Sequence, residues 1–92
     1  MPLPFLRRRS RDPTIPRRVT VYSRPGCHLC DDALVLLHGL QRQWMLQIHE
    51  IDISGDPALK RKYGLRIPVI VVDGRIELQA PITERAIRKA LR

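Results

Sequence analysis

The sequence of 92 residues lacks any apolar run that approaches the roughly 20 residues needed to cross a membrane. It contains no internal repeat, and its aromatic residues are few: one Phe, one Trp and two Tyr. A secretory signal needs an apolar stretch of about 7–15 residues, and the segment Pro2–Leu6 is too short to supply one. We therefore expect one small cytoplasmic domain with no membrane span.

Cysteine is also scarce, because Cys27 and Cys30 are the only two. Without an export signal, two closely spaced cysteines indicate redox chemistry or a metal rather than a structural cross-link. Their Cys-x-x-Cys spacing at the start of a predicted helix allows a disulfide across a single turn. The first thiol also faces the helix N-terminus, where backbone N–H groups and the macrodipole favour a thiolate. The pair can therefore react as well as cross-link.

Positive charge is concentrated at the start of the sequence. Residues 1–18 hold six arginines and one acidic residue, so they carry five of the eight net positive charges. Four prolines there argue against a helix or a central strand, so we expect an extended or disordered arm over residues 1–17 and a folded domain over residues 18–92. The arginines are Arg7, Arg8, Arg9, Arg11, Arg17 and Arg18, and the prolines are Pro2, Pro4, Pro13 and Pro16.

The simplest interpretation of this arm is a solvated tail. The alternative is an electrostatic contact with nucleic acid, anionic lipid or an acidic protein. No aromatic stacking platform accompanies the arginines, which argues against nucleic acid.

The first half of the folded domain predicts a strand followed by a helix. Residues 19–22 are β-branched or aromatic, as is typical of a strand. Apolar residues at helical spacing then run from Leu29 through Leu40 to Trp44 and predict one buried helix face.

The second half predicts three strands and two helices. A continuous apolar run at 68–72 indicates a strand buried on both faces, and the dipeptide Asp73-Gly74 is a hairpin signal. Asp56 and Thr83 are predicted helix N-caps, and Gly64 is the predicted end of the first of these helices. The strands are expected at 47–52, 68–72 and 75–79, and the helices begin at Pro57 and after Thr83.

These elements follow the order β-α-β-α-β-β-α. A βαβ unit followed by a ββα unit, with Cys-x-x-Cys at the first helix start, is the thioredoxin-like architecture. Residues 21–30, Val-Tyr-Ser-Arg-Pro-Gly-Cys-His-Leu-Cys, resemble the active-site segment of the glutaredoxin family, and the Cys-His-Leu-Cys-Asp version resembles a less-studied glutaredoxin-like branch. The resemblance implies an α/β, thioredoxin-like fold with a four-stranded mixed sheet flanked by three helices.

The resemblance also implies a thiol–disulfide oxidoreductase that uses Cys27 and Cys30 as a dithiol–disulfide couple. In the family mechanism, the thiolate of Cys27 at the exposed tip attacks a substrate disulfide. Cys30 lies one turn further in, is more buried, and resolves the mixed disulfide. We expect protein or glutathione disulfides as substrates, glutathione or a dithiol as reductant, no tightly bound cofactor, no metal and a monomer.

Pro68 is the second position that the resemblance marks. In thioredoxin-like proteins a cis-proline before the third strand packs beside the reactive disulfide, and Ile67-Pro68-Val69 resembles that segment. A cis bond would leave the Ile67 backbone free to pair with an extended substrate and would discourage metal capture. The alternative is an ordinary trans proline at a strand entrance, because only about 5–6% of X–Pro bonds are cis.

Ionisable residues flank the cysteines. A His28 imidazolium would stabilise the thiolate and make the disulfide more oxidising; alternatively, His28 fills a tolerant exposed position. Arg24 stands where many glutaredoxins carry a lysine, and it either stabilises Cys27, binds a substrate carboxylate or is solvated. Asp31 could accept the proton of Cys30, although support of the helix terminus requires only its position.

One part of the glutaredoxin pattern is missing. Typical members bind the γ-glutamyl end of glutathione with a Gly-Gly-x-Asp-type segment ahead of the last helix, whereas residues 79–84 are Gln-Ala-Pro-Ile-Thr-Glu. The Pro-Tyr between the cysteines is also replaced by His28-Leu29. These departures put efficient glutathione turnover in doubt, although Arg24 and Arg66 could attract the carboxylates of glutathione.

Two other functions use the same features. Cys27 and Cys30 from two chains could hold an iron–sulfur cluster or zinc, because such clusters usually take four thiolates and one chain supplies two. Iron–sulfur glutaredoxins commonly have one active-site cysteine, so Cys30 counts against this alternative. In the third interpretation the fold is a non-enzymatic scaffold and the basic arm makes the functional contact.

Overall fold

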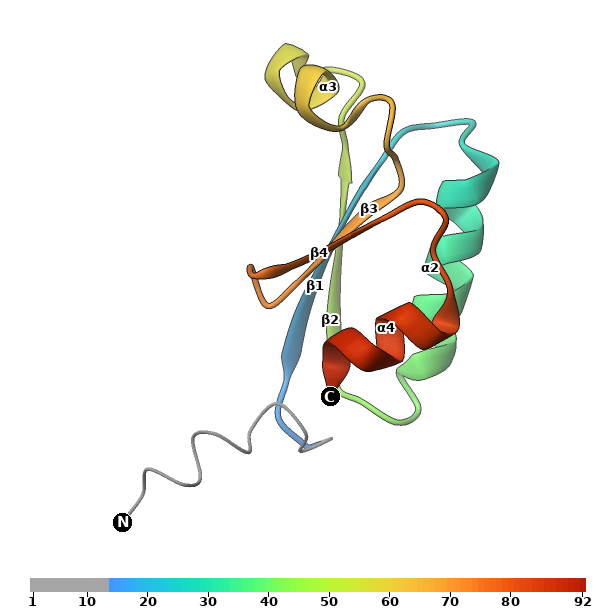
Figure 1. The fold of residues 1–92 in the computed structure, drawn as a ribbon, viewed down its shortest axis with the longest axis vertical. Coiled ribbons are helices and arrows are strands. Elements are labelled where there is room, and N and C mark those ends of the chain that lie inside the picture. The colour runs from blue at the N-terminus through green and yellow to red at the C-terminus, as the bar shows by residue number, and fades with distance from the viewer. Residues whose placement is uncertain (1–13) are drawn as a thin grey trace.

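A computed structural model of the chain describes residues 14–92. The expected arm therefore lies outside the described residues, except for its last four positions. The described residues form a four-stranded mixed sheet and three helices (Figure 1). In chain order these elements are β1 (Arg17–Ser23), α2 (His28–Leu40), β2 (Leu46–Asp52), α3 (Pro57–Tyr63), β3 (Val69–Val72), β4 (Ile76–Gln79) and α4 (Glu84–Leu91).

The sheet has the strand order β2-β1-β3-β4. β1 pairs with β2 in parallel and with β3 in antiparallel, and β4 returns antiparallel beside β3. Helix α2 connects the two parallel strands, as such a crossover requires. This topology confirms the predicted element order and the α/β, thioredoxin-like fold class.

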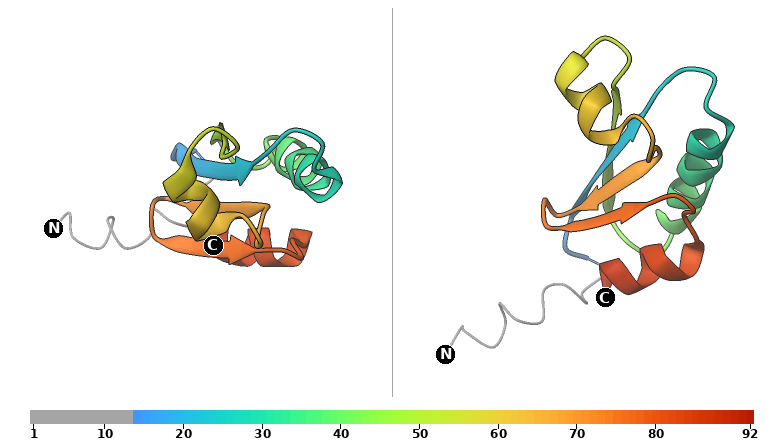
Figure 2. Two further views of the ribbon diagram at one scale, coloured as in Figure 1. Left: turned by 90° about the horizontal axis from the view of Figure 1, so that it is seen from above. Right: turned by 45° about the horizontal axis from the view of Figure 1, so that its top comes forward.

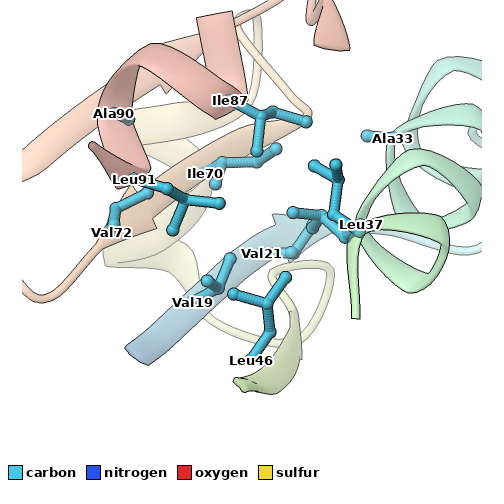
Figure 3. Packing of buried hydrophobic residues seen from close by; sticks show 11 residues of the cluster. Val19, Val21, Ala33, Leu37, Leu46, Ile70, Val72, Ile87, Ala90 and Leu91 are labelled. Carbon is cyan, nitrogen blue, oxygen red and sulfur yellow. The ribbon is translucent and has the colours of Figure 1, made fainter. Parts of the chain in front are cut away.

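Helices cover both faces of the sheet. On one face, the buried side chains of β1 and β3 pack against α2 and α4 (Figure 3). On the other face, Tyr63 of α3 packs with Val69 and Tyr22, and the two tyrosine rings stack with centroids 4.4 Å apart. Figure 2 shows α3 separated from α2 and α4 by the sheet. β3 is thus buried on both faces, as its continuous apolar sequence predicted.

Turns form where the sequence places them. Asp73 and Gly74 connect β3 to β4 with φ values of 53° and 70°, the left-handed conformations that a tight hairpin turn requires. The side chain of Asp56 accepts hydrogen bonds from the backbone N–H groups of Ala58 and Leu59 and so caps α3. The Thr83 hydroxyl accepts from the N–H of Ala86 and caps α4.

The structure corrects two expectations about the first helix. Helix α2 ends at Leu40, so Trp44 lies in the following turn, although its ring still packs on the main core. Leu29 is not on the buried face, because 55% of its surface is exposed. The buried face begins instead at Cys30 and continues through Ala33, Leu37 and Leu40.

Gly64 ends α3 as expected, but it does not adopt the left-handed conformation that commonly favours glycine at the end of a helix. Its φ of −52° is right-handed rather than left-handed, so positive φ does not explain the glycine. A Cβ at this position would lie 2.5 Å from the carbonyl oxygen of Lys60. The missing side chain therefore allows close approach of the helix backbone.

Arg17 is the first residue of β1 and is only 3% exposed, although the sequence grouped it with the arm arginines. Its Nε donates to Oδ2 of Asp73 at 2.6 Å, and its Nη1 donates to the carbonyl oxygen of Leu91 at 2.6 Å. The guanidinium thus ties the start of β1 to the hairpin turn and to the end of α4. None of the helices among residues 14–92 has the length and apolar character needed to cross a bilayer.

Candidate functional site

The two cysteines lie at the start of α2, just after the loop that connects β1 to this helix. Cys27 is the N-cap of α2, with extended backbone (φ −95°, ψ 102°), and Cys30 lies in the first helical turn. Their sulfur atoms form a disulfide, with the two Cα atoms 5.2 Å apart. Gly26, with φ of 79°, supplies the left-handed turn that brings the chain from β1 into this cap.

Backbone donors converge on Cys27. The N–H of Cys30 donates to Sγ of Cys27 at 3.2 Å, and the N–H groups of Cys30 and Asp31 both approach its carbonyl oxygen at 3.1 Å. Sγ of Cys27 therefore faces the N-terminal end of α2. Backbone N–H groups at a helix start favour negative charge on an atom that they face.

The two cysteines differ in accessibility. Cys30 is 1% exposed, whereas Cys27 is partly exposed. Cys27 is therefore more accessible to a molecule in solution than Cys30. This asymmetry is what the predicted division into an attacking and a resolving cysteine requires.

Pro68 and the disulfide lie at the same end of the two central strands, β1 and β3. Tyr22 pairs with Val69 across the antiparallel β1–β3 ladder, so the residue before β3 lies opposite the end of β1. The Ile67–Pro68 bond is cis, as the resemblance implied, and the Ala80–Pro81 bond is cis as well. Pro68 is fully buried, and Ile67 is half-buried against the core on the α3 side of the sheet.

His28 points along α2 rather than into the protein. Its side chain is 84% exposed, and its Nε2 lies 3.3 Å from Oδ2 of Asp32, one helical turn further on. This contact becomes an ion pair only when the imidazole is protonated. His28 is thus next to the disulfide in sequence but has a partner other than Cys27.

Arg24 lies on the other side of the motif, in an exposed position. It borders a shallow cleft of about 340 Å³ between the first turn of α2 and the ends of β1 and β2. Within residues 14–92 it forms no ion pair, so its guanidinium is available to a ligand. The cleft is lined by Ser23, Arg24, Pro25, Asp31, Glu50 and Asp52.

Sequence reasoning missed the polar pair at the floor of this cleft. The hydroxyl of Ser23, which is 2% exposed, donates to Oε2 of Glu50 at 2.9 Å. One sequence signal exists: apolar residues alternate with polar ones from Leu46 to Ile53, and the alternation breaks at His49-Glu50. Asp52, which also lines the cleft, accepts two hydrogen bonds at Oδ1, from the hydroxyl and from the backbone N–H of Ser54. These bonds hold the pKa of Asp52 below its ordinary value, and the hydroxyl contributes more than the N–H.

Arg66 is not free to reach a ligand in this structure. Its Nη1 donates to Glu77 and to Gln79, each at 3.0 Å, and its guanidinium lies 5.3 Å from the centre of the Tyr63 ring. The Thr83 hydroxyl, in the segment that replaces the Gly-Gly motif, is likewise used as a helix cap. Among the described residues, no three His, Cys, Asp or Glu side chains are grouped so as to hold a metal ion.

Comparison with known proteins gives a family. The family model for the Glutaredoxin-like domain (DUF836) matches residues 18–92. Protein XcR50 from X. campestris is 34% identical, with 79% of this chain and 93% of that chain covered and a TM-score of 0.69. Protein Ne2328 from Nitrosomonas europaea is 33% identical, with 84% and 93% covered and a TM-score of 0.73.

The comparisons also find more distant matches. The uncharacterized protein Rv0508 of Mycobacterium tuberculosis is 28% identical over 76 residues, which cover 77% of this chain and 78% of the relative. A mutant thioredoxin from Halobacterium salinarum is 22% identical, with 82% of this chain and 71% of that chain covered and a TM-score of 0.64, and so shares the fold. The chain therefore belongs to the glutaredoxin-like domain family (DUF836).

Proposed function

We propose that this protein is a thiol–disulfide oxidoreductase in which Cys27 is the nucleophile and Cys30 the resolving thiol. The observation that carries the proposal is the position of Cys27 at the N-cap of α2, where the N–H of Cys30 donates to its Sγ at 3.2 Å. A thioredoxin-like fold with a Cys27–Cys30 disulfide supports a redox function, and the division of roles is assigned from the unequal exposure of the two cysteine residues.

The proposed reaction begins with the reduced protein. The Cys27 thiolate attacks one sulfur of a substrate disulfide, forms a mixed disulfide and releases the other substrate sulfur as a thiolate, which takes up a proton. Cys30 then loses its proton and attacks Sγ of Cys27. This second step releases the remaining substrate thiol and leaves the Cys27–Cys30 disulfide. Two electrons have then passed from the two cysteines to the substrate, whose two thiols carry the proton released by Cys30 and one proton taken up from water.

The surrounding residues are assigned supporting roles. The Ile67 backbone precedes Pro68 at the end of the sheet near the disulfide, and it would pair with an extended substrate segment. Arg24, which has no ion-pair partner in the described part of the chain, would attract a substrate carboxylate. His28, when protonated, would add positive charge beside the Cys27 thiolate.

Substrate and reductant are part of the same proposal. Protein disulfides suit the site better than glutathione disulfide, because Thr83 and Arg66 are engaged within the fold and the Gly-Gly segment is absent. A small dithiol or glutathione would then return Cys27–Cys30 to the dithiol. Each chain carries both thiols, so a monomer is sufficient.

A redox titration tests the proposal. The protein is equilibrated with mixtures of oxidised and reduced dithiothreitol, free thiols are alkylated, and intact mass reports the dithiol fraction. We expect one reversible two-electron transition, assigned to Cys27 and Cys30 by its loss in a Cys27→Ser variant. A pair that stays locked in one state across the titration would contradict the proposal. Bound iron or zinc in a reconstituted dimer would favour the cluster-binding alternative instead.

A further inference from the structure

A stripe of positive charge runs along the outer side of α4. Arg85, Arg88, Lys89 and Arg92, here called the basic stripe, are spaced by three, one and three residues, so they share one face of the helix. The opposite face of α4 is buried in the main core. The four cationic side chains alone line a shallow hollow of about 440 Å³.

Most of this charge is not neutralised within the protein. Arg88 pairs with Glu84, with Nε 2.7 Å from Oε2. Arg85, Lys89 and Arg92 form no ion pair with any residue from 14 to 92. Charge that is left unpaired on one face of a helix creates a local field that attracts anions.

An apolar hollow adjoins the basic stripe. The Arg88 guanidinium lies 5.7 Å from the centre of the Trp44 ring and donates to Oε1 of Gln43, so the stripe contacts the turn between α2 and β2. In that turn Met45 is 54% exposed. A hollow of about 250 Å³ is lined there by Pro16, Gln41, Trp44, Met45, Leu46 and Gln47.

Both hollows lie at the end of the molecule where β1 begins (Figure 1). There the Arg17 side chain, at the start of β1, donates a hydrogen bond to the carbonyl oxygen of Leu91, the last residue of α4. The disulfide follows the other end of β1, about 20 Å away for a strand of this length. Five of the eight acidic residues among 14–92 lie toward that far end: Asp31, Asp32, Glu50, Asp52 and Asp56. Five basic residues lie toward that end as well, namely Arg24, Lys60, Arg61, Lys62 and Arg66, so these ten charges cancel. The excess positive charge of the described residues therefore lies at the end with the basic stripe.

We propose that the basic stripe and the adjacent apolar hollow bind the surface of an anionic lipid bilayer. Lys and Arg side chains near an anionic bilayer each strengthen binding about fivefold, and exposed apolar groups beside them enter the boundary between headgroups and acyl chains. Met45 is placed to do so. Nucleic acid fits this end less well, because the half-buried Trp44 ring is covered by Arg88 and offers no stacking platform.

This orientation leaves the reactive site free. With the basic stripe against the bilayer, the disulfide at the opposite end of β1 faces away from the anionic surface. The binding is independent of the proposed redox function, since it uses neither Cys27 nor Cys30.

Vesicle sedimentation of the full chain tests the proposal. We expect binding to vesicles of phosphatidylcholine mixed with phosphatidylglycerol, little binding to phosphatidylcholine alone, and weakening by salt. The double variant Arg85→Gln/Lys89→Gln should lower the partition coefficient about 25-fold, from about fivefold per charge. The matched variant Lys60→Gln/Arg61→Gln removes the same two residue types from exposed positions on α3 and should change it less than about twofold.

Three results would overturn the proposal. They are no binding to the anionic vesicles at low salt, equal losses in the two double variants, and binding to duplex DNA that depends on Arg85 and Lys89 without any binding to vesicles. All four substituted positions are solvent-exposed, so circular dichroism is expected to show an unchanged fold for both variants.

Discussion

Replacement of Arg17 by alanine is expected to lower the free energy of unfolding by about 3 kcal/mol. The change removes a charge-assisted hydrogen bond to Asp73, worth about 1.5–3 kcal/mol, and a hydrogen bond to the Leu91 carbonyl, worth about 1 kcal/mol. The Asp73 side chain is 29% exposed, so water recovers part of the loss and the upper end of this range is not reached.

The assay is thermal unfolding followed by circular dichroism, with urea denaturation as a second probe. For a domain of this size, a loss of about 3 kcal/mol lowers the melting temperature by about 12–24 °C. Arg18→Ala is the matched control, because the Arg18 side chain is exposed and only its backbone bonds to Asp73, through the N–H and the carbonyl oxygen. It should change the unfolding free energy by less than about 0.5 kcal/mol.

A double-mutant cycle isolates the ion pair. Asparagine, like aspartate, tolerates the left-handed conformation at position 73. The coupling energy between Arg17→Ala and Asp73→Asn therefore contains no contribution from strain in the turn. We expect a coupling energy of at least about 1 kcal/mol. If Arg17→Ala and Arg18→Ala had equal small effects, Arg17 would be an arm residue and the account of its burial would be wrong.

Two further predictions concern local features. Gly39 lies inside α2 with open space where a Cβ would project, so Gly39→Ala should raise the unfolding free energy by up to about 1 kcal/mol; a lower melting temperature would contradict this. Ser54→Ala removes the main hydrogen bond to Asp52 and should raise the Asp52 pKa toward its ordinary value, measured by NMR titration. Because the folded pKa of Asp52 is depressed, its contribution to stability is present above its ordinary pKa of 3.8 and is lost as the pH falls through the lowered value. An unchanged titration of Asp52 in the variant would show that Ser54 is not the cause.

Local sequence patterns account for most of the fold. The apolar run of β3, the turn at Asp73-Gly74 and the caps Asp56 and Thr83 each depend on residues within a few positions, and each is present as expected. The site follows for the same reason, since Cys-x-x-Cys between a strand and a helix places Cys27 at the helix cap.

What the sequence did not predict depends on distant contacts. Arg17 stands among arginines that indicate a tail, and its burial rests on partners 56 and 74 residues away. Leu29 fits the helical spacing of apolar residues but is exposed. The buried face of α2 begins instead at Cys30, which was not among the apolar residues used to predict that face. The Ser23–Glu50 pair likewise forms only because β1 and β2 lie side by side in parallel.

The most direct test of the central claim is to trap the mixed disulfide. Reduced Cys30→Ser and Cys27→Ser variants are incubated with a low-molecular-weight disulfide, and intact mass is followed with time. The account predicts that Cys30→Ser rapidly gains one substrate half on Cys27, whereas Cys27→Ser, with only the buried Cys30, reacts far more slowly. Equal rates, or faster modification of Cys30, would contradict the assignment of Cys27 as the nucleophile.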